Sequence, residues 1–188
     1  MSDSTGSLTP ASGQTRATPS DASAITLLAL DVDGVLTDGT INIDADGREF
    51  KSYNVRDGFA LRLWDTMGFT AAVITGRTSQ SILHRMADLR VPHVIQGSRD
   101  KGASLDELCR VARVRPEQVA FLADDWPDLS VLRRVGYPMA VGDASEPVKA
   151  LARYTTTAHG GRGAVREAVE HLLHAKGLLS KALSMYDR

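Results

Sequence analysis

Short apolar runs alternate with amphipathic segments along most of the chain, from residue 27 to residue 173. Five runs have the length and composition of buried strands, at 27–30, 69–74, 91–95, 119–122 and 137–141. The spacing of apolar residues between and after these runs predicts helices at 60–67, 79–89, 101–111, 129–135, from 145 onward and at 164–173. Strands that alternate with helices in this way predict an α/β fold, in which a doubly wound parallel sheet carries helices on both faces.

Residues 40–53 follow a different pattern. The segments 40–44 and 48–53 alternate between apolar and polar residues, and the Asp46-Gly47 pair between them favours a tight turn. Because this pattern is partly polar, we expect a β-hairpin that lies outside the main sheet as a flap. Residues 42–47 also resemble the start of a calcium-binding loop, but Tyr53 stands where that loop requires a bidentate glutamate.

Length and composition predict one domain, at residues 25–176 of the 188-residue chain. Residues 1–24 are rich in small and polar residues and are expected to form a disordered N-terminal arm, and 177–188 a C-terminal tail. The net charge of −1 gives no field for nucleic acid or an anionic membrane. With neither an apolar signal core nor a run of transmembrane length, a cytoplasmic protein is expected. Cys109 is the only cysteine, which excludes an intrachain disulfide.

Reactive residues follow three of the predicted strands, and a lysine begins one helix: Asp31 and Asp33, Thr75 and Gly76, Asp124 and Asp125, and Lys101. Parallel strands bring their carboxyl ends to one edge of the sheet, where open α/β folds bind ligands. Residues two apart in an extended chain point to the same side, so Asp31 and Asp33 can face one site. Each residue alone could instead be an ordinary turn, cap or solvated side chain.

Together these residues suit phosphoryl transfer. Mg²⁺ prefers oxygen ligands, which Asp31 and Asp124 can supply. The Asp31 carboxylate can attack phosphorus, and Asp33 can protonate the leaving alkoxide and later deprotonate the hydrolytic water. The phosphate oxygens can be held by a hydroxyl group, by backbone amides at a helix start and by a cation: Thr75, Gly76, Arg77 and Lys101.

The order and spacing of these residues resemble the haloacid dehalogenase (HAD) superfamily of phosphatases. The segments 31–37, 75–77, 100–101 and 124–125 are similar to its four motifs. The segments 54–58 and 160–167 further resemble the 3-deoxy-D-manno-octulosonate 8-phosphate phosphatases, and the resemblance covers residues 26–175. It implies a Rossmann-type fold without a cap domain. It also implies a phosphomonoesterase of lipopolysaccharide biosynthesis that releases phosphate through an aspartyl-phosphate intermediate.

The resemblance also implies roles for particular residues. Mg²⁺ would be held by Asp31, the main-chain carbonyl of Asp33, and Asp124, with Asp125 close behind. Contacts to a small phosphorylated sugar acid would come from Asn54, Val55, Arg56, Asp57, Gly58, Arg62, Arg77, Arg85 and Lys101. Family members are similar in forming homotetramers, in which hairpins meet centrally and a neighbour's C-terminal segment closes each site. Arg162, flanked by glycines, is interpreted as a substrate-binding residue that is carried on a mobile arm.

Several alternatives stay open at this point. Pro127 replaces an asparagine of the family pattern, and proline offers no donor, which bears on substrate choice. A nine-carbon ulosonate 9-phosphate is a second candidate substrate, because related phosphatases share these motifs. A non-catalytic binding or assembly module with the same fold is a third possibility, against which the retained aspartates count. His171 and His174 are interpreted as a helix face rather than a zinc site because no third ligand is near. Trp64 and Trp126 are expected to be packing residues.

Overall fold

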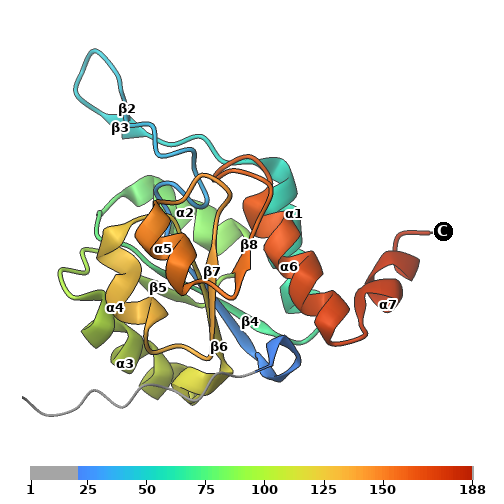
Figure 1. Ribbon diagram of the computed structural model, residues 1–188. Helices are drawn as coiled ribbons and strands as arrows, with labels where there is room; N and C mark the ends of the chain where they lie inside the picture. The colour runs from blue at the N-terminus through green and yellow to red at the C-terminus, as the bar shows by residue number, and fades with distance from the viewer. Residues whose placement is uncertain (1–20, 188) are drawn as a thin grey trace, which may run out of the picture.

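The computed structural model describes residues 21–187 (Figure 1). The strands are β1 (Leu27–Leu30), β2 (Asn42–Ile43), β3 (Glu49–Phe50), β4 (Thr70–Ile74), β5 (His93–Ile95), β6 (Val119–Ala123), β7 (Tyr137–Ala140) and β8 (Tyr154–Thr155). The α-helices are α1 (Val55–Thr66), α2 (Gln80–Asp88), α3 (Lys101–Ala112), α4 (Leu129–Leu132), α5 (Glu146–Leu151), α6 (Ala164–Ala175) and α7 (Leu179–Ser184). Three short 3₁₀ helices are η1 (Ala22–Ala24), η2 (Pro116–Gln118) and η3 (Trp126–Asp128).

Six parallel strands form the main sheet in the order β5-β4-β1-β6-β7-β8. All four residues of β1 are buried, because the strand pairs with β4 on one side and β6 on the other and is covered on both faces. The chain extends the sheet away from β1 first in one direction and then in the other. The carboxyl end of β1 is therefore the topological switch point, where this class of sheet binds ligands.

Helices cover both faces of the sheet, as the sequence pattern predicts. On one face α1 packs beside α6, and on the other α3, α4 and α5 form a row (Figure 1). Trp64 of α1 is fully buried and donates its Nε1–H to the carbonyl of Thr70 at 2.9 Å, which confirms its packing role. Trp126 is 64 % exposed, so the same prediction was wrong for it, because η3 turns that side chain outward.

The hairpin of β2 and β3 stands outside the main sheet and projects from the body of the molecule (Figure 1). Its ladder is only two residue pairs long, shorter than predicted. The carboxylate of Asp44 accepts hydrogen bonds from the backbone N–H groups of Asp46 and Arg48, and this network closes the turn. The segment after β3 leaves the ladder, and there the Lys51 side chain turns inward to the site described below.

Both predicted domain boundaries differ from the structure. The predicted arm at 1–24 lies mostly outside the described residues, but Asp21 caps η1 and Ala22 is buried, so the packed body begins before residue 25. In the predicted tail, α7 packs on α6 and buries Ala182. No helix in the described part of the chain has the length and apolar character needed to cross a membrane.

Candidate active site

Three carboxylates converge at the switch point of the sheet. Asp31 directly follows β1, Asp124 directly follows β6, and Asp128 ends η3. One oxygen from each lies within 4.8 Å of the others, an arrangement that can hold a metal ion. The sequence prediction named Asp125 as the next residue behind the metal, but Asp125 is exposed, and the 3₁₀ turn returns the chain so that Asp128 joins the cluster instead.

Lys101 lies among these carboxylates, as the topology predicts. Its Nζ is 2.9 Å from Oδ2 of Asp31 and 2.6 Å from Oδ1 of Asp128, and its side chain is 5 % exposed. Lys101 is the first residue of α3, and Asp100 caps that helix by accepting a hydrogen bond from the N–H of Ala103 at 3.1 Å. The cap fixes the position from which the ammonium group reaches the carboxylates.

The cluster carries more negative than positive charge. Burial and the neighbouring Asp31 raise the pKa of Asp124 to about 7. The same two causes raise the pKa of Asp128 to about 7, although Lys101 opposes them. Oδ2 of Asp128 is buried and accepts no hydrogen bond from the described residues. A hard divalent cation would neutralise the surplus negative charge and would give the unpaired oxygen of Asp128 a partner. The donor set therefore fits Mg²⁺.

Asp33 lies beside this cluster and is paired with two cations. Its Oδ1 is 2.5 Å from Nζ of Lys51, and its Oδ2 is 3.8 Å from Nε of Arg77. Glu49 forms ion pairs with both Arg77 and Lys51. Sequence reasoning missed Glu49 and Lys51, although residues two apart on a hairpin arm share a face, and that spacing could have indicated them.

Thr75 directly follows β4, the strand beside β1, at the edge that carries Asp31. Its side chain is almost completely buried, and its Oγ1 accepts a hydrogen bond from the N–H of Arg77 at 3.4 Å. Gly76 is exposed at the turn that follows. This placement agrees with a phosphate-binding turn, which stays a prediction here.

Residues 54–58, which are predicted to contact the substrate, include two that pack against neighbouring helices. Asp57 is 1 % exposed, and its two carboxylate oxygens accept hydrogen bonds from the N–H groups of Gly163 and Arg166, at 3.1 and 2.9 Å. Gly58 is buried where α1 meets α2, and a β-carbon there would lie 2.2 Å from Nη2 of Arg85. Both residues are closed in by neighbouring helices, and their contact with substrate stays a prediction.

The remaining members of this set have varied surroundings. Asn54 caps α1 through the N–H of Arg56, and its Nδ2 donates to the carbonyl of Gly161 at 3.3 Å. Val55 and Arg56 are exposed at the start of α1. Arg62 and Arg85 form ion pairs with Asp65 and Asp88 on their own helices, and Arg85 also lies over the Tyr53 ring.

The glycine-rich segment 160–163 is seated on the loop that follows Asp31, rather than forming a mobile arm. The N–H of Gly161 donates to the carbonyl of Val35 at 2.8 Å, and a β-carbon on Gly160 would lie 1.8 Å from the carbonyl oxygen of Gly34. Arg162 is exposed and pairs with Asp38 of the same chain at 3.0 Å. These glycines thus serve close backbone approach, which corrects the interpretation of Arg162 as a swinging group.

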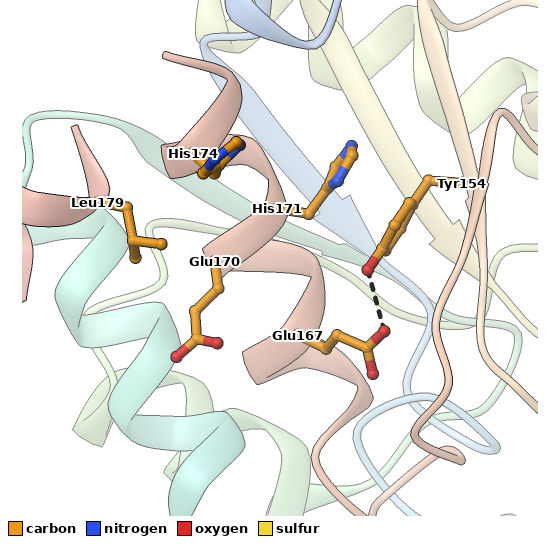
Figure 2. A pocket seen from close by; sticks show the side chains of 6 residues that line it. All are labelled: Tyr154, Glu167, Glu170, His171, His174 and Leu179. Carbon is orange, nitrogen blue, oxygen red and sulfur yellow. Dashed lines mark hydrogen bonds between the residues drawn. The ribbon is translucent and has the colours of Figure 1, made fainter. Parts of the chain in front are cut away.

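A hollow of about 240 Å³ lies between α6, β8 and α7 (Figure 2). Its two carboxylates are already engaged: Glu167 accepts hydrogen bonds from Tyr154 and from the N–H groups of Thr157 and Ala158, and Glu170 pairs with Arg166. His171 stacks on Tyr154, with ring centroids 3.8 Å apart, and its Nε2 is 2.9 Å from the hydroxyl of Tyr137. These contacts therefore hold the segment after β8 against α6.

The amino-acid sequence of the chain is similar to those of known hydrolases. A model of haloacid dehalogenase-like hydrolases matches residues 91–168. The chain is 42 % identical over 161 residues to the 3-deoxy-D-manno-octulosonate 8-phosphate phosphatase KdsC of Escherichia coli K12, which covers 86 % of each chain. KdsC of Yersinia pestis is 40 % identical over 164 residues, 87 % of this chain and 88 % of that one.

The chain is also similar to solved structures of phosphatases. The 3-deoxy-D-manno-octulosonate 8-phosphate phosphatase of Moraxella catarrhalis, in complex with magnesium, phosphate and KDO, superposes with a TM-score of 0.86 at 36 % identity. That match covers 88 % of this chain and 95 % of the other. The cobalt-bound phosphatase of Haemophilus influenzae matches with a TM-score of 0.82 at 36 % identity, over 85 % of this chain and 94 % of that one.

Proposed function

The chain belongs to the 3-deoxy-D-manno-octulosonate 8-phosphate phosphatase family of HAD hydrolases, and on that premise we propose that it hydrolyses this sugar phosphate to the free sugar acid and phosphate. As a member of the family it is a phosphatase. The observation that carries the proposal is the cluster of Asp31, Asp124 and Asp128 with Lys101 at the switch point. The identity of the proposed substrate comes from the relatives named above.

Asp31 is the nucleophile in the proposed mechanism. Its carboxylate oxygen forms a bond to phosphorus while the bond from phosphorus to the sugar oxygen breaks, and that oxygen takes a proton from Asp33. In the second half, water attacks phosphorus, Asp33 accepts its proton, and the electron pair returns to the Asp31 carboxylate. Lys101 holds Asp31 in place through the 2.9 Å ion pair.

Mg²⁺ is the cofactor of this site. Asp31 and Asp124 would hold the ion with the main-chain carbonyl of Asp33, and Asp128 is close enough to take part. When bound, the ion neutralises the charge of the phosphate and of the carboxylates that surround it. The relatives bind such ions: the Moraxella structure contains magnesium and the Haemophilus structure contains cobalt.

A nine-carbon ulosonate 9-phosphate remains the alternative substrate. Pro127 is exposed beside Asp128, where the family pattern has an asparagine. A proline there cannot donate a hydrogen bond to the sugar. Specificity is therefore the part of the proposal that most needs measurement.

The proposal is tested by phosphate release from a panel of phosphorylated sugars, with Mg²⁺ and with chelator. The panel contains 3-deoxy-D-manno-octulosonate 8-phosphate, a nine-carbon ulosonate 9-phosphate and hexose 6-phosphates. We expect the highest kcat/KM on the eight-carbon substrate and no release with chelator. Asp31→Asn protein, prepared in parallel, reports contaminating phosphatase. A preference for hexose phosphates or for the nine-carbon acid would reject the substrate assignment.

The chain also fits a homotetramer whose sites are completed by neighbouring subunits. Three large apolar side chains of the hairpin are exposed, Ile41, Ile43 and Phe50, and an isolated hairpin is only marginally stable. Packing the hairpins together would bury these side chains. Light scattering on the purified protein should give a tetramer, and Ile43→Glu should give smaller species. Val111→Glu, at an exposed apolar position on α3, is the matched control.

A further inference from the structure

The hairpin reaches into the active site through one buried cation. The Lys51 side chain is only 2 % exposed, although the residue belongs to the arm that follows β3. Lysine is almost never buried unless it is paired, and here its Nζ lies 2.5 Å from Oδ1 of Asp33 and 2.9 Å from Oε1 of Glu49. Glu49 in turn pairs with Arg77. A closed ring of four charged side chains therefore joins the hairpin to Asp33.

This ring treats the two oxygens of Asp33 differently. Oδ1 carries the Lys51 ammonium group, whereas Oδ2 is buried and accepts no hydrogen bond from any described residue. The nearest recorded cation to Oδ2 is Nε of Arg77, at 3.8 Å. One oxygen is thus held and the other is free to exchange a proton. A general acid needs one oxygen placed at the leaving group, and a carboxylate that could rotate freely would lose that placement.

We propose that Lys51 is a positioning residue for Asp33, and that Oδ2 of Asp33 is the atom that exchanges the proton. Lys51 touches neither the phosphate nor the leaving group and keeps its own protons throughout. It acts by fixing Oδ1, with Glu49 as the second anchor of the ammonium group. The inference rests on the phosphatase activity proposed above, but not on which sugar phosphate is the substrate.

A leaving-group series tests this role. Aryl phosphates from p-nitrophenyl to phenyl phosphate differ in how much the leaving oxygen needs a proton, and kcat/KM reports the steps up to phosphoryl transfer. We expect Lys51→Met to lower kcat/KM for phenyl phosphate and for the sugar phosphate by about 100-fold, and for p-nitrophenyl phosphate by less than about 5-fold. Lys51→Arg should restore part of the loss, and Glu49→Gln should give a smaller loss of the same kind.

Two controls make the result decisive. Arg48→Met, in the same hairpin at a side chain that is 75 % exposed, should match the wild type on every substrate. In the Asp33→Asn background, Lys51→Met should cause no further loss on phenyl phosphate, because the group that it positions is already gone. Thermal unfolding checks that each variant is folded.

Other outcomes overturn the inference. An equal loss across the aryl series would mean that Lys51 serves the fold, and a loss confined to KM of the sugar phosphate would make it a substrate contact. Wild-type protein that hydrolyses the aryl series but not the sugar phosphate would reject the substrate proposal alone. Wild-type protein with no activity on any phosphate would reject both.

Discussion

Gly34 lies directly against the carboxylate of Asp124: a β-carbon at Gly34 would fall 2.0 Å from Oδ2 of Asp124. The Gly34 φ of +87° is also in the region that favours glycine. We therefore expect Gly34→Ala to displace Asp124 and to raise the Mg²⁺ concentration needed for half-maximal activity by about 100-fold or more. Metal titration of phosphate release measures this change.

Gly47 provides a matched control for that prediction. It has a similar φ of +77°, but no atom lies within 4 Å of a β-carbon built there. Gly47→Ala should lower the free energy of unfolding by about 1 kcal/mol through backbone strain, and leave the Mg²⁺ requirement unchanged. Equal metal requirements in the two variants would contradict the close approach of Gly34 and Asp124.

Asp31→Asn should keep the fold but lower kcat by a factor of about 10⁴ or more, because an amide cannot form the acyl phosphate. Mass spectrometry after rapid quenching should find phosphate on a peptide containing residue 31 in the wild type and none in the variant. Appreciable turnover by the variant would reject Asp31 as the nucleophile.

Metal binding should stabilise the protein more at pH 8 than at pH 5.5. Burial raises the pKa of Asp124 to about 7 from an ordinary value near 3.8, so the metal-free fold gains stability when this group is protonated and loses it as pH rises through about 7. Mg²⁺ binds the ionised carboxylates. At 100 times its dissociation constant it adds about 2.7 kcal/mol, or about 5 to 11 °C in Tm. Thermal unfolding with chelator and with Mg²⁺ at both pH values measures the difference.

Asp57→Ala should destabilise the fold by about 2 kcal/mol, because it leaves two N–H groups at the start of α6 without acceptors. Folded Asp57→Ala should hydrolyse p-nitrophenyl phosphate at close to the wild-type kcat. Asp65→Ala, on the exposed face of the same helix, should change stability by less than about 0.5 kcal/mol. An Asp57 variant of unchanged stability with a raised KM for the sugar phosphate would instead support its predicted role as a substrate contact.

The sheet and the carboxylates at its edge were predictable because their signals are local. The apolar runs before Asp31 and Asp124 are long enough to be buried strands, and parallel pairing then places both residues at one edge. Lys101 followed from the same topology. The 3₁₀ turn at 126–128 carries no such periodic signal, so the position of Asp128 in the cluster was missed.

Contacts between distant segments were less predictable. The sequence singled out the motif at 54–58, but it did not show that Asp57 accepts a hydrogen bond from α6, a helix that begins more than 100 residues later. Glycines at 160–163 can indicate either flexibility or close packing, and only the position of the 34–38 loop decides between them. The inward turn of Lys51 likewise depends on Asp33, which is 18 residues away.

The hydrogen bond from Gly161 to Val35 also bears on the order in which parts of the site form during synthesis of the chain. Domains generally fold as units as they emerge from the ribosome, and β1, β4 and β6 have all been made by residue 123. The loop after Asp31 gains this neighbour only when residues 160–163 emerge, since the N–H of Gly161 donates to the carbonyl of Val35. A nascent chain halted before that point holds the nucleophile but lacks the support of its loop. Competence for catalysis therefore arrives late in translation, after most of the sheet.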